Sequence, residues 1–153
     1  MASLMLDELC QYLVAYTPQI TFGTAVLSWN TGSSADNLYG YELPDQPHDC
    51  VSVWPYGGGL PRLIDNIDEP TFQVRVRSVI VTDGEQTIQQ IYAALQGIFE
   101  RALVTNGDWH WNRLFALQNP VYLGKDEVQR HEFCANFRGF VRNPNRYAGA
   151  TEL

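Results

Sequence analysis

Histidine and cysteine are the residue types in this sequence that could hold a metal ion or act as nucleophiles. There are three of each: His48, His110, His131, Cys10, Cys50 and Cys134. No two histidines have the H-x-x-x-H or H-E-x-x-H spacing of helical zinc sites, and no two cysteines form a C-x-x-C pair. We interpret the cysteines as small buried hydrophobic residues, and we predict no metal and no cofactor.

Other catalytic motifs are incomplete. No serine lies in a G-x-S-x-G nucleophile elbow. Gly57-Gly58-Gly59 is not followed by a Lys-Ser or Lys-Thr pair or by a helix start, which favours a flexible turn over a phosphate-binding loop. The segment Asp65–Glu69 lacks the glycine and the final glutamate of a calcium loop and is interpreted as a solvated turn. The sequence therefore predicts a protein that is not an enzyme.

One aromatic segment keeps an alternative open. Trp109-His110-Trp111 could stack on a sugar or a base, although such turns more often fill the edge of a hydrophobic core. Together with His131 it could line a cleft, which would make the protein a small-molecule binding domain or a hydrolase.

The strand that must position any site is predicted between residues 71 and 81. Its apolar side chains alternate with polar ones at Phe72, Val74 and Val76, and this period of two is typical of a half-buried strand. Three aliphatic residues follow at 79–81, which predicts that this end of the strand is covered on both faces.

A long amphipathic helix is predicted directly after this strand. Asp83 and Gln86 have the spacing of a capping box, and apolar residues continue at helical spacing through Phe99 to Ala102. A shorter helix is predicted at residues 4–16, with Ser3 as its N-cap.

Together these elements predict an α+β fold. We expect a single domain over residues 1–143, in which an N-terminal helix and one long central helix pack on a twisted, mostly antiparallel sheet, and a loose tail at 144–153. The other predicted strands are at 20–29, 50–54, 113–119 and 130–142, the last antiparallel to residues 72–81.

Charge is unevenly divided along the chain. Residues 1–69 hold nine acids and one base, a net charge of −8, whereas residues 70–153 hold eight acids and nine bases, a net charge of +1. The total of −7 should repel free nucleic acid. There is no apolar run long enough to span a bilayer and no basic region of a signal peptide, so we expect synthesis in a cytoplasm and no membrane contact.

The charge division suggests self-association. Four arginines are predicted on the outward faces of the two long strands: Arg75, Arg77, Arg138 and Arg142. They could be a solvated face that blunts edge pairing. Our hypothesis is instead a subunit interface, because arginine is enriched at protein contacts and an acidic segment is available on a second copy. The acids of that segment are Asp65, Asp68 and Glu69.

A long polar connection, Asn30–His48, is a second candidate contact. Structureless loops of this length are usually functional or mobile. Three apolar or aromatic residues lie within it: Leu38, Tyr39 and Tyr41. We expect this loop to become ordered only against a partner protein.

Three short motifs resemble a known family. Phe72-Gln73-Val74-Arg75-Val76-Arg77 leads into a helix, Pro120–Asp126 has the pattern Pro-x-Tyr-Leu-Gly-x-Asp, and Arg130–Phe137 has the pattern Arg-x-x-Phe-x-x-Asn-Phe. In this order the motifs are similar to those of the tail terminator and minor capsid (neck) proteins of long-tailed bacteriophages.

The resemblance implies a structural virion protein that is assembled in the host cytoplasm. It implies a homohexameric ring that caps the tail tube, stops tube growth and offers its other face to head-side neck or connector proteins, while genomic DNA passes through the lumen without specific binding. A head- or tail-completion protein of the same neck is the alternative within this class. A negatively charged wall would fit such a lumen.

Overall fold

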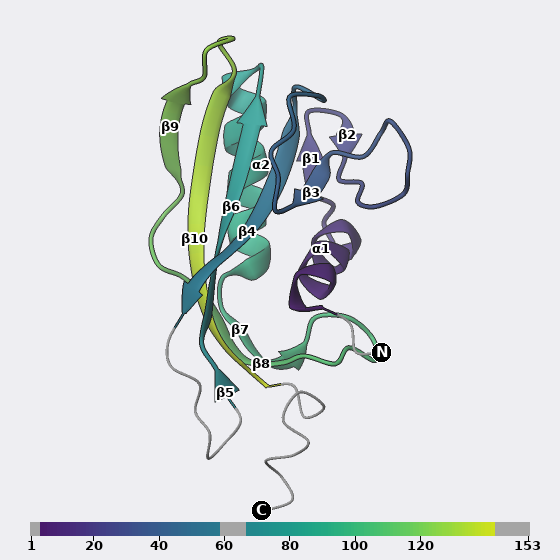
Figure 1. Cartoon of the computed structure of the whole chain (residues 1–153), viewed down its shortest axis with the longest axis vertical. Helices are drawn as coiled ribbons and strands as arrows, with labels where there is room; N and C mark the ends of the chain where they lie inside the picture. The colour runs from purple at the N-terminus through teal and green to yellow at the C-terminus, as the bar shows by residue number, and fades with distance from the viewer. Residues whose placement is uncertain (1–3, 59–66, 143–153) are drawn as a thin grey trace, which may run out of the picture.

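The computed structural model describes residues 4–58 and 67–142 as two helices and ten strands in one layered arrangement (Figure 1). The helices are α1 (Met5–Ala15) and α2 (Val81–Leu95). The strands are β1 (Thr21–Phe22), β2 (Ala25–Val26), β3 (Leu38–Gly40), β4 (Cys50–Gly58), β5 (Ile67–Asp68), β6 (Pro70–Ser78), β7 (Ile98–Ala102), β8 (His110–Ala116), β9 (Val121–Lys125) and β10 (His131–Arg142). The expected tail at 144–153 lies outside the described residues.

The main sheet has eight strands, in the order β3-β4-β6-β10-β8-β7, with β5 and β9 also paired to β10. Among the paired strands of the described residues, only β3 and β4 are parallel. The predicted pairing of the two long strands is confirmed, because Phe72 lies opposite Phe137 and Val76 lies opposite Phe133. The α+β class and the mostly antiparallel sheet are therefore confirmed.

The inward side chains of β6 and β10 form the centre of the core. Phe72, Val74 and Val76 are fully buried, and the rings of Phe72 and Phe137 stack with their centroids 5.3 Å apart. Trp111 of β8 meets Phe72 edge to face at 6.4 Å. The alternation in the sequence identified this buried surface correctly, because one face of an antiparallel sheet is covered while the other stays open.

The long helix is shorter than predicted at its C-terminal end. α2 ends at Leu95, and Gly97, with φ +84°, turns the chain into β7. Phe99, predicted to be in the core, is therefore in an edge strand and is 68% exposed.

The start of α2 also differs from the prediction. Its N-cap is Ile80 and no side chain caps it, so Asp83 is not the cap but lies in the first turn. Val79, Ile80 and Val81 are all exposed, so the prediction that they are covered on both faces is wrong. The turn is instead held by polar groups, since Asp49 accepts a hydrogen bond from the Val79 amide at 2.9 Å.

α1 lies beside β3 and β4, and it carries a buried carboxylate. Glu8 is 1% exposed and accepts hydrogen bonds from the amides of Asp108 at 2.9 Å and Trp109 at 3.4 Å. The helix thereby fixes the β7–β8 connection. Leu4, rather than the predicted Ser3, is the N-cap residue, and Ser3 lies outside the described residues.

Two of the smaller predicted strands are divided or extended. Residues 20–29 form a hairpin of β1 and β2 that turns at Gly23, where φ is +55°. β4 continues through Pro55 to Gly58 instead of ending at Trp54. Proline is tolerated there because β3 pairs with β4 only as far as Val53, so the outer edge of β4 has no strand partner at Pro55 within the described residues.

Candidate functional site

Both helices pack on one face of the sheet, and α2 lies behind β6 and β10 in Figure 1. The contact is close, because a Cβ atom on Gly84 of α2 would lie 2.8 Å from the ring of Phe133. Neither of the two helices in the described part of the chain covers the opposite face of β4, β6 and β10. We call this surface the open face, and it is the candidate functional site.

Strand register arranges the side chains of the open face in rows across β4, β6 and β10. Trp54 lies opposite Gln73, which lies opposite Asn136. The neighbouring rows contain Ser52, Arg75 and Cys134 on one side, and Tyr56, Thr71 and Arg138 on the other. None of these nine side chains is acidic, although the whole chain has a net charge of −7. These three rows of the open face are therefore aromatic and cationic, whereas the next row contains Glu132, which lies opposite Arg77.

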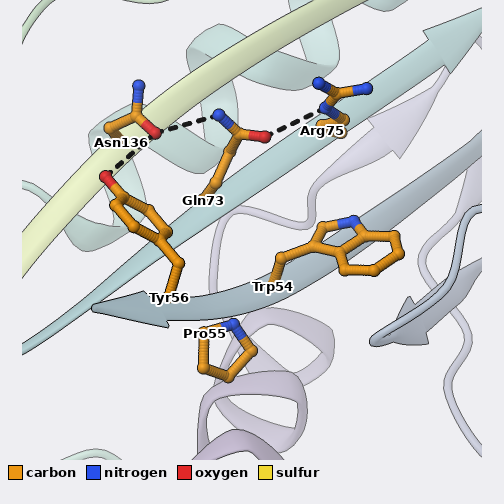
Figure 2. Close-up of a pocket in the computed structure, with 6 residues that line it drawn as sticks. All are labelled: Trp54, Pro55, Tyr56, Gln73, Arg75 and Asn136. Atoms are coloured by element: carbon orange, nitrogen blue, oxygen red, sulfur yellow. Dashed lines mark hydrogen bonds between the residues drawn. The ribbon is translucent and has the colours of Figure 1, made fainter.

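A hydrogen-bonded network connects three of these strands (Figure 2). The amide oxygen of Asn136 accepts from the Tyr56 hydroxyl at 3.2 Å and from the Gln73 side chain at 3.0 Å. The amide oxygen of Gln73 accepts from Nε of Arg75 at 2.9 Å. The network holds Arg75 in a fixed position on the sheet.

The same residues line an open cavity of about 510 Å³, together with Trp54 and Pro55. The indole nitrogen of Trp54 is buried and has no hydrogen-bond partner within the described residues. Aromatic and arginine side chains around a concave surface are typical of the centres of protein interfaces. This arrangement can bind a protein partner, and the aromatic walls would keep water from the arginine.

Of the predicted interface arginines, Arg77 has a different role. It is 3% exposed, and its guanidinium donates hydrogen bonds to backbone carbonyl oxygens of the loop before β4, from residues Pro44, Asp45, Pro47 and His48. A partner cannot reach a side chain that its own loop covers. Assigning Arg77 to a subunit interface was therefore wrong.

The other interface candidates are more accessible. Arg75 and Arg138 are half-buried on the open face, and Arg142 is exposed at the end of β10. Asp68 is in β5, paired opposite Val141, and Glu69 lies between β5 and β6, so both are at the far end of the sheet from Ser78. Asp65 lies outside the described residues. Their contact with a second copy stays a prediction.

The Asn30–His48 loop is folded onto its own chain. This contradicts the prediction that the loop becomes ordered only against a partner protein. Asp36 accepts hydrogen bonds from Ser28, Thr31 and Gly32, and β3 pairs with β4. Leu38 is 1% exposed and belongs to the core, so its assignment as a contact was wrong.

The two tyrosines of that loop differ from each other. Tyr39 is half-buried and donates to the Asp36 carbonyl oxygen at 2.8 Å. Tyr41 is 60% exposed and has a φ of +63°, so it keeps a surface position that a partner can reach.

The alternative cleft does not form. Trp109 and Trp111 are buried, and Trp111 lies next to Val141, whereas His131 is at the opposite end of β10. Ten residues of strand separate the two positions, about 33 Å. His110 is bound to Glu100 of β7 at 3.0 Å. The predicted convergence on His131 was therefore wrong.

The cysteines are free and buried, as predicted. Burial raises the pKa of the Cys10 thiol to about 12 and that of Cys50 to about 11. Within the described residues, no group of three His, Cys, Asp or Glu side chains could hold a metal ion, and no helix there is long and apolar enough to cross a membrane.

Several residues of the open face were not identified from the sequence. Trp54 and Tyr56 lie on the same face as Arg75. The predicted strand ended before Pro55, so the alternation that places these two residues on one face was not recognised. For Asn136, only the strand register shows that it meets Gln73.

Comparison with known protein families decides the identity of the chain. The family described as bacteriophage tail terminator protein matches residues 16–138, which is most of the sequence. The chain belongs to this family. As a tail terminator family member, it is a structural protein of the phage virion, and the resemblance noted in the sequence is confirmed.

A solved structure supports the fold of this tail terminator family member. It is similar, with a TM-score of 0.60 and 15% sequence identity, to a chain of the virion of a native gene transfer agent particle, over 90% of this chain and 93% of that one. The sequence has no significant match among curated proteins.

Proposed function

We propose that this protein is the tail terminator of its phage. Copies of the chain form a ring that sits on the last ring of the tail tube, stops further growth of the tube, and presents its other side to a head-side neck protein. The match of residues 16–138 to the tail terminator family carries this proposal. The likeness to a chain of a gene transfer agent virion supports the fold that the ring would use.

The mechanism is geometric rather than chemical. A contact between two different surfaces of the same chain closes into a ring when the rotation between subunits divides a full turn evenly. We propose six copies, which at 17.3 kDa each give a particle of about 100 kDa. A tube subunit that meets the closed ring no longer finds another tube subunit to which it can add.

The subunit contact joins the arginines of the open face to the acidic segment before β6 of the next copy. Arg75 and Arg138 supply the positive side, with Arg142 at the end of β10, and Asp68 and Glu69 supply the negative side. Tyr41 remains a candidate contact with the tube or the connector. The net charge of −7 fits a ring through which DNA must slide, because a negatively charged wall does not bind phosphates.

Tube polymerisation in vitro tests the proposed function. Purified tail tube protein of the same phage is polymerised with and without this protein, and tube ends are examined by negative-stain electron microscopy. We expect closed rings of about 100 kDa for the free protein, and in the mixture, tubes that end in an extra ring and stop growing. Tubes that keep growing at both ends in excess protein would contradict the proposal.

A further inference from the structure

The cavity on the open face offers hydrogen-bond donors and few free acceptors. The side-chain oxygens of Gln73 and Asn136 already accept bonds inside the network. The groups without a partner within the described residues are donors: the two terminal nitrogens of Arg75, the indole nitrogen of Trp54 and the amide nitrogen of Asn136. A cavity whose unused groups are all donors, one of them charged, is suited to a carboxylate.

We propose that this cavity binds a carboxylate side chain of a second copy of the chain, and that Glu69 supplies it. The proposal rests on the ring described above and specifies its subunit contact. In it, a glutamate oxygen accepts from the guanidinium of Arg75 while the Trp54 and Asn136 donors complete its hydrogen bonds. A charged pair with aromatic neighbours of this kind is a typical centre of an interface.

The pairing has to occur between two copies. Glu69 and Arg75 are six residues apart along the same extended segment, which separates them by about 20 Å. A glutamate side chain cannot cover that distance. The two groups therefore occupy different positions on one chain, and a contact that joins two different positions can repeat from copy to copy until a ring closes.

Three other acidic residues are less suitable because they are already engaged. Asp36 binds Thr31 and Ser28, and Asp45 and Asp126 both bind Arg130. Glu69 has no such bond within the described residues and is half-buried. Charge complementarity between its carboxylate and Arg75 favours a second copy as the partner.

The walls of the cavity would strengthen the pair. Trp54, Pro55 and Tyr56 line the same cavity as Arg75 and give it apolar surface (Figure 2). Excluding water from an ion pair lowers the local dielectric and strengthens the attraction. Because Gln73 and Asn136 fix the guanidinium before binding, less side-chain freedom is lost when the carboxylate arrives.

A charge exchange tests the proposal. Arg75→Glu and Glu69→Arg are made singly and together. The ring population of each variant is measured by native mass spectrometry and sedimentation velocity. If rings form only on a template, tail tubes are added. Each single variant should weaken association at least about tenfold. The double variant should recover most of it, because the pair is restored with its charges exchanged.

Lys125→Glu is the matched control, since it makes the same charge change on an exposed residue of β9 outside the cavity. It should assemble as the wild type does. Single variants that assemble normally, a double variant that is not rescued, or a control that is equally impaired would each overturn the inference. If the wild type neither forms rings nor caps tubes, the proposed function is wrong. If the wild type caps tubes but the double variant does not recover association, only the Glu69–Arg75 contact is wrong.

The indole donor provides an independent test. Trp54→Phe keeps an aromatic wall and removes only the N–H group, so association should weaken about fivefold while the circular dichroism spectrum stays unchanged. Trp29→Phe is the control, because Trp29 packs against the core beside β3 and does not line the cavity. Equal association of both variants with the wild type would contradict the role of the Trp54 donor.

Discussion

The guanidinium of Arg77 donates a hydrogen bond to the carbonyl oxygen of Pro47 at 2.8 Å, although 30 positions separate the two residues in the sequence. Arg77 and Arg75 are neighbours on the same face of β6, yet the loop before β4 covers only Arg77. One arginine therefore stabilises the fold while the other remains available to a partner.

Replacing Arg77 should destabilise the protein. Arg77→Ala leaves several buried carbonyl oxygens without a donor, and we expect the free energy of unfolding to fall by about 3 kcal/mol. Urea denaturation measures this change. Arg142→Ala, which removes an exposed arginine, should change stability by less than about 0.5 kcal/mol. A similarly small effect of Arg77→Ala would show that the loop does not depend on this side chain.

Glu8 should be required for the β7–β8 connection. Glu8→Ala removes the acceptor for the amides of Asp108 and Trp109, and it should lower the free energy of unfolding by about 2 kcal/mol. Hydrogen exchange should speed up at those two amides before the protein unfolds globally. Glu127→Ala is the control, because Glu127 is exposed in the turn before β10. Unchanged exchange at both amides would argue against this contact.

Acid should loosen the loop that Asp36 holds together. A hydrogen bond from the Thr31 side chain, assisted by Ser28 and by the backbone amides of Thr31 and Gly32, holds the pKa of Asp36 below its usual value. A carboxylate whose pKa is lowered by folding stabilises the protein above its unfolded pKa, near 4, and this contribution is lost as the pH falls through the folded pKa.

The comparison of wild type with Asp36→Asn measures this effect. The wild type should be the more stable protein at pH 7, and its advantage should shrink as the pH falls below about 4. Urea midpoints recorded from pH 7 to pH 2.5 give the difference directly. A constant difference over that range would contradict a role for the ionised carboxylate.

Gly139 should not tolerate a side chain. A Cβ atom there would lie 2.2 Å from the ring of Trp111, which is fully buried, and 2.9 Å from the Arg113 carbonyl oxygen. We expect Gly139→Ala to cost about 3 kcal/mol of unfolding free energy, measured by thermal or urea denaturation. Gly40→Ala is the contrast, because its Cβ would meet only the flexible end of Leu6, and it should cost less. Equal costs would contradict this reading of the packing.

The two long strands were predictable because their environment is encoded locally. Phe72, Val74 and Val76 alternate with polar residues, and so do the inward residues of β10, since each strand has one covered face and one open face. The family motifs lie on these same strands, which is why the resemblance could be recognised from short segments.

The wrong predictions concern residues whose environment depends on contacts between distant segments of the chain. Apolar residues at helical spacing continue to Phe99, but the chain reverses at Gly97 and pairs with β8, so the spacing is fortuitous. Arg77 repeats the outward pattern of Arg75, and no local signal shows that a loop 30 residues earlier will cover it. The arrangement of Trp54, Arg75 and Asn136 on the open face depends on register across three strands, which no single segment encodes.

β10 pairs with four other strands, β5, β6, β8 and β9, and follows all of them in the chain. None of these four pairings can form until residues 131–142 have left the ribosome. The sheet should therefore form late in synthesis, and an incomplete chain would lack the strand that carries Asn136 and Arg138. Such a dependence would keep truncated subunits out of the proposed ring, which a single defective copy would leave incomplete.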